Sequence, residues 1–179
     1  VTGSIAAVKA PILVSRLIKA GVDVKCVLTQ SATKLVSPLS LSTLCRNKCY
    51  QDKDQWDYSQ TKPLHIALAE WAELIIVAPM SATSLSKFTS GNADGLLASI
   101  LLASKSQIVI AAAMNTSMWS NQSVKKNWKQ VLEVKTLNLE SQLVGWCIFC
   151  RYKMLRKQRL WLFQACLAQR FYQTHQAHC

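Results

Sequence analysis

Apolar positions along the chain fall into short runs that alternate with amphipathic segments. Residues 73–78 and 107–111 are almost continuously apolar, which is typical of strands covered on both faces. Residues 22–29 also form a strand pattern. The chain begins at 1–3 without a Met, as if a preceding strand were cut away, so we expect the first strand of the sheet to be truncated.

Helical patterns separate these strands. In residues 5–20 apolar side chains recur at a spacing near 3.6; Gly21 is expected to end this helix, and Pro11 to kink its early turns. Residues 46–62 are polar and are predicted to be a loop. Further helices are predicted at 31–36, from 38, and at 63–72, 84–91, 94–104 and 120–131. Strands that alternate with helices predict an α/β fold with a doubly wound parallel sheet.

Three loops follow the carboxyl ends of strands in this arrangement. Each combines small or hydroxyl residues with the start of a helix, where backbone N–H groups and hydroxyls can hold a phosphate. Ser and Thr at such positions also serve as ordinary helix caps. Because three such loops would converge on one edge, we favour a mononucleotide site there. The loops contain Gly3, Ser4 and Ile5, then Thr29 and Ser31, then Ala78, Pro79, Ser81, Ala82 and Thr83.

The segment 112–119 is the most informative part of the chain. It follows the apolar run 107–111 and places Asn115 at the carboxyl end of a strand, where open α/β sheets bind ligands. The amide of Asn115 can orient a carboxylate or another amide, or it can simply cap the following helix. The neighbouring Met114 is more typical of packing.

Composition limits the alternatives. The chain has 179 residues, of which 50% are hydrophobic and 17% charged, and this fits one folded domain with a sizeable core. No apolar run reaches the roughly 18–20 residues of a membrane helix. The formal charge is +12, but the residues after Glu140 contain six basic residues and no acidic ones, so specific nucleic-acid binding is not expected. We therefore divide the chain into a domain at 1–133 and an atypical basic tail at 134–179.

Seven cysteines with irregular spacing do not form a metal motif. Cys147 and Cys150 make one isolated CxxC pair, so reduced thiols of a cytoplasmic protein are favoured over zinc. Cys26 lies inside a strand pattern and is expected to be a small core residue.

Six segments carry a further signal in their order along the chain: 1–7, 38–41, 64–73, 78–83, 91–94 and 114–119. Together they resemble the homo-oligomeric flavin-containing cysteine decarboxylases, and the resemblance extends over about residues 1–132.

The resemblance implies FMN bound at the three loops. It places His65 at the family's active-site histidine and Asn115 at the asparagine that holds the cysteine end of the substrate, with Met114 and Asp94 nearby. Asp94 could equally cap a helix. The implied reaction is oxidation of the cysteinyl moiety to a thioaldehyde, followed by loss of carbon dioxide to give an enethiol.

Within the family, the chain looks most like the branch of coenzyme A biosynthesis, in which phosphopantothenoylcysteine becomes 4′-phosphopantetheine. A peptidyl-cysteine decarboxylase and a non-catalytic flavin-binding or regulatory subunit remain alternatives. The resemblance also implies a trimer, or a dodecamer of trimers, and no metal.

The chain departs from the family pattern at several positions. Ala112 stands where the family usually has proline, and Gly95 stands where a second acidic or amide residue is common. No glycine-rich segment with a catalytic cysteine follows residue 133. One hypothesis is that the tail is an out-of-frame or degenerate translation; the alternative is a genuine basic helix at 155–171.

Overall fold

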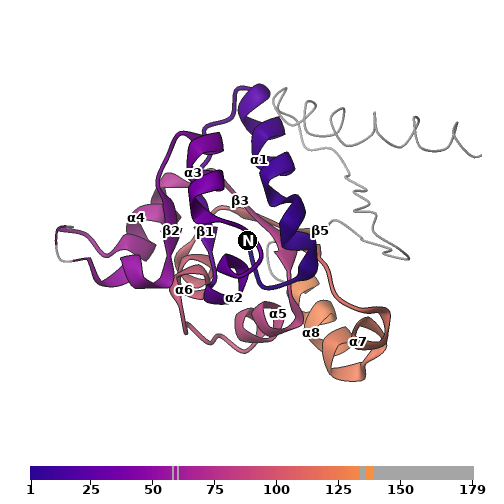
Figure 1. The fold of residues 1–179 in the computed structure, drawn as a ribbon. Helices are drawn as coiled ribbons and strands as arrows, with labels where there is room; N and C mark the ends of the chain where they lie inside the picture. The colour runs from indigo at the N-terminus through magenta and orange to yellow at the C-terminus, as the bar shows by residue number, and fades with distance from the viewer. Residues whose placement is uncertain (58, 60, 134–135, 139–179) are drawn as a thin grey trace, which may run out of the picture.

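The computed structural model describes residues 1–57, 59, 61–133 and 136–138. Its strands are all paired in parallel (Figure 1). β1 (Cys26–Leu28) pairs with β2 (Cys49–Gln51), and β3 (Leu74–Met80) pairs with β4 (Gln107–Ala112), which in turn pairs with β5 (Thr136–Asn138).

The first two residues join these two sheets. The Val1 nitrogen donates to the Val27 carbonyl at 2.7 Å, and the Val1 carbonyl accepts from Thr29 N–H at 3.2 Å. Thr2 N–H donates to the Pro79 carbonyl at the end of β3, at 3.3 Å. Val1 and Thr2 thus lie between the carboxyl ends of β1 and β3 and join the two sheets.

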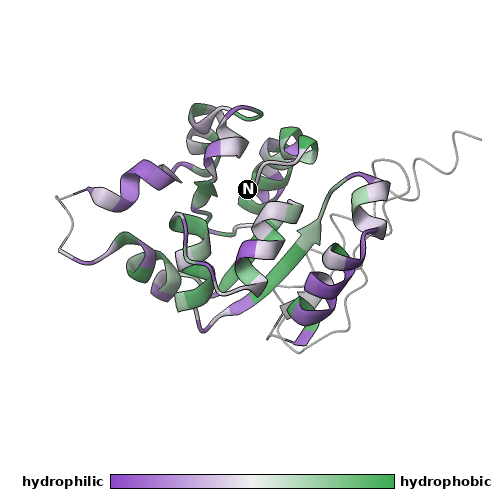
Figure 2. Cartoon of the chain, turned by 90° about the horizontal axis from the view of Figure 1, so that it is seen from below, coloured by the Kyte–Doolittle hydropathy of each residue, from purple (hydrophilic) through white to green (hydrophobic). Residues whose placement is uncertain are grey.

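Helices cover both faces of the strands. Val77 of β3 and Ile110 of β4 are buried against α5 (Ala82–Thr89), α6 (Leu96–Ala103) and α8 (Gln122–Glu133). Ala78 and Val109, one position along, instead pack with Leu13 of α1 (Ala10–Lys19). In Figure 2 the strand in the middle of the molecule is accordingly green along its length. The predicted doubly wound α/β fold is confirmed.

The other helices complete these two layers. α3 (Pro38–Cys45) packs beside α1 over β1 and β2, and α4 (Leu64–Trp71) packs against α6 on the opposite face. α2 (Gln30–Thr33) follows β1, and α7 (Thr116–Ser120) follows β4.

Several predicted elements differ from the structure. The single helix expected at 5–20 is a 3-10 helix, η1 (Ile5–Lys9), followed by α1, in which Pro11 is the second residue. Proline has no N–H and clashes with a preceding α-helical turn, so the α-helix begins there and does not continue through it. The strand expected at 22–29 shortens to β1.

The predicted loop at 46–62 was wrong in part. It contains β2 and a second 3-10 helix, η2 (Asp52–Trp56). A three-residue strand is too short to show a reliable period, which also explains why β5 was not predicted. The basic tail lies outside the described residues except for β5. Across the described part of the chain, no helix is long and apolar enough to cross a membrane.

Candidate functional site

A cleft of about 630 Å³ lies at the carboxyl ends of β1, β2 and β3. Each of the three predicted loops contributes to its lining. The contributing residues are Gly3 from the first loop, Thr29 and Ser31 from the second, and Ser81 and Thr83 from the third.

The first and second loops touch at Gly3. A Cβ atom at this position would lie 2.4 Å from the Cβ of Ser31, closer than two carbon atoms can approach without a shift of one backbone segment. Glycine is therefore required for the first loop to pack directly on the start of α2.

Thr2 ties the first loop to the third. Its hydroxyl is buried, donates to the Pro79 carbonyl at 2.8 Å and accepts from Ser81 N–H at 2.7 Å. The peptide bond between Ala78 and Pro79 is cis. Sequence reasoning missed Thr2, and the only signal available was a hydroxyl residue directly before Gly3.

The hydroxyls on the cleft differ in whether they already have a hydrogen-bond partner. Ser81 is the N-cap of α5 and accepts from Ser84 N–H at 3.3 Å, so it has the ordinary capping role as well as its place on the cleft. Thr29 Oγ1 is buried without a hydrogen-bond partner. A buried hydroxyl without a partner is unfavourable by about 1–3 kcal/mol, which indicates a ligand oxygen as its natural partner.

Five predicted loop residues are not part of the lining. Ala78 is buried against Val109, and Ile5 is 61% exposed. The five are Ser4, Ile5, Ala78, Pro79 and Ala82.

His65 is the second residue of α4 and does not line the cleft. Its Nδ1 atom is buried without a hydrogen-bond partner. The neighbouring Leu64 and Leu68 pack with Leu96 and Ile100 of α6, which fixes the helix that carries the imidazole.

Asn115 is exposed at the start of α7. Its Oδ1 accepts from Ser117 N–H at 2.8 Å, so the side chain caps this helix, as the simpler alternative held. Met114 packs partly against the core cluster around Val77.

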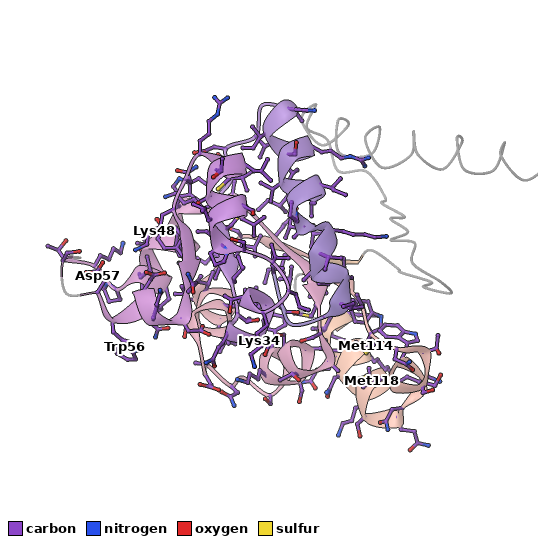
Figure 3. The ribbon with its side chains drawn as sticks, in the orientation of Figure 1. Lys34, Lys48, Trp56, Asp57, Met114 and Met118 are labelled. Atoms are coloured by element: carbon purple, nitrogen blue, oxygen red, sulfur yellow. The ribbon has the colours of Figure 1, made fainter. Side chains whose placement is uncertain are left out.

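One chain does not bring His65 and Asn115 together. α4 and α7 lie on opposite sides of the ribbon in Figure 1. In Figure 3 Met114, the residue before Asn115, lies at the end of the molecule opposite Trp56, which follows β2.

The segment predicted to be a loop contributes residues that sequence reasoning missed. Asp52, Gln55 and Trp56 of η2 line the cleft, and the Trp56 side chain is 73% exposed there. Asp94 also lines the cleft and forms an ion pair with Lys87. The N-cap of α6 is Gly95, so Asp94 does not cap this helix.

The described thiols are buried in the core. Burial raises the pKa of the Cys26 thiol to about 12 and that of Cys49 to about 11, helped by neighbouring thiols. Cys45 is buried beside them, and its thiol donates to the Asn47 carbonyl. Cys26 is thus a core residue, as predicted. Among the described residues, no group of three or more His, Cys, Asp or Glu side chains could hold a metal ion.

Comparison with known proteins gives consistent matches. A family model described as Flavoprotein matches residues 1–155. The coenzyme A biosynthesis bifunctional protein CoaBC of Borreliella burgdorferi is 41% identical over 138 residues, which is 77% of this chain and 34% of that protein. The phosphopantothenoylcysteine decarboxylase of Mus musculus is 38% identical over 127 residues, which is 68% of this chain and 60% of that protein.

A solved structure supports the same relationship. The crystal structure of the FMN-dependent cysteine decarboxylase SpaF superposes with a TM-score of 0.72 at 26% identity, covering 92% of this chain and 93% of that one. The chain spans about a third of the bifunctional relative. The resemblance to flavin-containing cysteine decarboxylases is confirmed, and the chain belongs to the flavoprotein family.

Proposed function

We propose that this protein binds FMN in the cleft and catalyses decarboxylation of the cysteine moiety of phosphopantothenoylcysteine to give 4′-phosphopantetheine, in the cytoplasm. The observation that carries the proposal is the convergence of three hydroxyl-bearing loops on one cleft, with the buried Thr29 hydroxyl lacking a partner. The names of the mouse relative and of SpaF support the reaction and the cofactor, respectively.

The residues on the cleft fit a flavin mononucleotide. Ser31, Ser81 and Thr83 offer hydroxyls to a phosphate or a polyol chain, and Thr29 Oγ1 would gain its missing partner. Leu97 and Leu101 of α6 supply apolar surface suited to a planar ring system. Each part of the cofactor would thus find matching chemistry on the lining.

Side chains alone supply no acceptor for the electrons that remain when carbon dioxide leaves the substrate. When bound, the flavin would supply the acceptor for the electron pair released by oxidation of the cysteine thiol, and the same pair would reduce the enethiol left after decarboxylation to the product. His65 is the residue proposed to move a proton at the substrate, and its buried Nδ1 makes no hydrogen bond among the described residues. Asn115 can hold the departing carboxylate with amide donors that carry no charge.

A complete site needs a second copy of the chain. His65 and Asn115 lie on opposite sides of one molecule, so a pocket containing both is formed only when the α7 side of one copy meets the α4 side of another (Figure 1). We therefore propose a homo-oligomer, a trimer or a dodecamer of trimers, with each site shared between copies.

The first experiment separates binding from catalysis. Purified protein reconstituted with FMN is expected to show the flavin absorbance bands and to release carbon dioxide from phosphopantothenoylcysteine. A peptide ending in cysteine tests the alternative substrate. A yellow protein that is inert with both substrates would favour a flavin-binding subunit, and a folded protein that remains colourless would contradict the whole proposal.

The second experiment tests the shared site. His65→Ala and Asn115→Ala variants should each be inactive alone. If copies share sites, mixing the two variants under conditions that exchange subunits restores a fraction of the activity, because some interfaces then carry both native residues. No recovery after demonstrated subunit exchange would contradict the shared site. His65→Ala mixed with itself is the matched control.

A further inference from the structure

Asp52 connects two helices across the cleft. Its Oδ1 accepts from Leu96 N–H, the first amide of α6, at 2.9 Å. Its Oδ2 accepts from Gln30 N–H, the first amide of α2, at 3.3 Å. Asp52 itself begins η2, so one carboxylate joins segments that are 22 and 44 residues away along the chain.

Both amides need an acceptor from outside their own helix. The first N–H groups of an α-helix have no partner within the helix. The N-cap of α6 is Gly95, which has no side chain to supply one. Gly95 also permits the close approach, because a Cβ atom there would lie 3.0 Å from Asp52 Oδ1, and its φ of +94° disfavours other residues.

The position of Asp52 gives this contact a role in the cleft. α2 follows β1, whereas α6 packs over both strand groups, through Leu97 and Leu101 against β3 and β4 and through Leu96 and Ile100 against Val27 of β1. Asp52, Gln30 and Gly95 all line the cleft. Thr2 links the first loop to the Ser81 loop, and Asp52 links the start of α2 to the start of α6.

We propose that Asp52 is a positioning residue that fixes the separation of the α2 and α6 walls, and so holds the cleft open at the width its ligand requires. The cofactor part of this inference rests on the proposed binding of FMN. A carboxylate suits the task, since charge-assisted hydrogen bonds to backbone N–H groups are about twice as strong as neutral ones.

Asp54 provides a matched control on the same 3-10 helix. Its carboxylate also accepts from a backbone N–H, that of Gln51 at 2.7 Å, and it pairs with Lys48 at 3.0 Å. These contacts stay within the β2–η2 segment and do not reach α2 or α6. Asp54→Asn therefore removes a comparable charge without changing a contact to α2 or α6.

The test measures two properties of the full chain. Hydrogen exchange of the Gln30 and Leu96 amides is followed in the protein without flavin, and FMN affinity is measured by quenching of flavin fluorescence. Asp52→Ala should speed exchange at both amides and weaken FMN binding roughly tenfold, the equivalent of losing about 1.4 kcal/mol. Asp54→Asn should leave both measurements at their wild-type values.

Asp52→Asn is the second variant, in case Asp52→Ala fails to fold. Its single amide oxygen can accept from only one of the two N–H groups, so one of these amides should stay protected while the other exchanges faster. Its FMN affinity should lie between those of the wild type and Asp52→Ala. A graded series of this kind is not expected from a general loss of stability.

The outcomes separate the two proposals. If the wild type does not bind FMN, the proposed function fails, and exchange at Gln30 and Leu96 still decides the positioning role. Unchanged exchange in the Asp52 variants overturns this inference. It is also overturned if the wild type binds FMN and the Asp52 variants bind it equally well.

Discussion

The loops around the cleft and the pair His65 and Asn115 differ in how one chain arranges them. The loops that carry Gly3, Thr29 and Ser81 come from distant parts of the sequence, yet they line a single cleft. His65 and Asn115 lie on α4 and at the start of α7, on opposite sides (Figure 1). A single copy can therefore build a cradle for the cofactor, but it cannot assemble the proposed catalytic pair.

This difference has a physical origin. In a parallel sheet the carboxyl ends of all strands lie at one edge. Loops that follow neighbouring strands are therefore brought together by the sheet itself. His65 lies within a helix on one face. Asn115 does follow a strand, but β4 lies beyond β3, and the cleft is formed at the ends of β1, β2 and β3. Both residues therefore lie outside the cleft of a single copy, and in the proposed homo-oligomer a second copy would bring them together.

The largest effect is expected from Asn115→Asp. Aspartate can still cap α7 through the Ser117 N–H, but it loses the amide donors and, in the proposed site, adds a negative charge next to the substrate carboxylate. Carbon dioxide release should fall about a hundredfold, as for other losses of a positioned donor, while FMN binding is unchanged. Asn121→Asp is the control, because Asn121 accepts from Ser123 N–H at 2.9 Å in the same way. Equal activity of the two variants would argue against the role of Asn115.

Gly3→Ala should disrupt the loops that line the cleft and leave His65 and Asn115 in place. The added methyl must displace Ser31, so we expect the free energy of unfolding to fall by about 1–3 kcal/mol and FMN affinity to be lost. Gly21→Ala is the comparison, because Gly21 has a φ of +78° and open space around a Cβ. It should be destabilised by roughly 1 kcal/mol and bind FMN normally. Chemical denaturation and flavin titration measure both quantities, and normal FMN binding by Gly3→Ala would contradict the proposed site.

Thr29→Val should lower the affinity for FMN without lowering the free energy of unfolding. Removing a buried hydroxyl that has no partner should leave the protein without flavin as stable as the wild type, or more stable by about 1 kcal/mol. FMN affinity should nevertheless fall several-fold, by up to about tenfold. Thr2→Val should instead lower stability by about 1–3 kcal/mol, because it leaves the Ser81 N–H without its acceptor. A loss of stability in Thr29→Val would mean that its hydroxyl already has a structural partner.

The smallest effect is expected from thiol reagents. Because burial raises the pKa values of Cys26 and Cys49 to about 12 and about 11, both remain protonated at about pH 8, where an exposed thiol is partly ionised. Peptide mapping after alkylation should find neither of them modified, and FMN binding should be intact.

The same shifts predict an alkaline loss of stability. Both thiols have pKa values in the folded protein above the ordinary value of 9.0. Their contribution to the free energy of unfolding is therefore complete below pH 9.0 and is lost as the pH rises through about 11 to 12. Denaturation curves across this range test the sign. A rise in stability above pH 9.0 would contradict it.

Much of the fold could be predicted because its central strands carry a strong signal. β3 and β4 are continuous apolar runs, and both lie close to their predicted positions. β2 was missed because three residues, Cys49–Gln51, are held as a strand by pairing with β1 and not by their own pattern. Local sequence therefore identified the elements that are buried on both faces and missed those that depend on a neighbour.

The same distinction applies to the candidate site. The loop residues on the cleft could be proposed from hydroxyls after strands. For Asn115 the sequence offered both a helix cap and a site residue, and the structure shows the cap. Thr2 and Asp52 could not be found in this way, because their partners lie 79 and 44 residues along the chain. No local pattern indicates which backbone amide such a side chain will reach.

Val1 and Thr2 link the two strand groups, so a ligand bound at one group can affect the position of the other. Its backbone hydrogen bonds reach β1 through Val27 and Thr29, and the end of β3 through Pro79. A ligand that shifts the Ser81 loop therefore also shifts Val1 and Thr2, which hydrogen-bond to the Thr29 loop. Cofactor capture and the docking of the two strand groups should thus be thermodynamically linked, so that each strengthens the other.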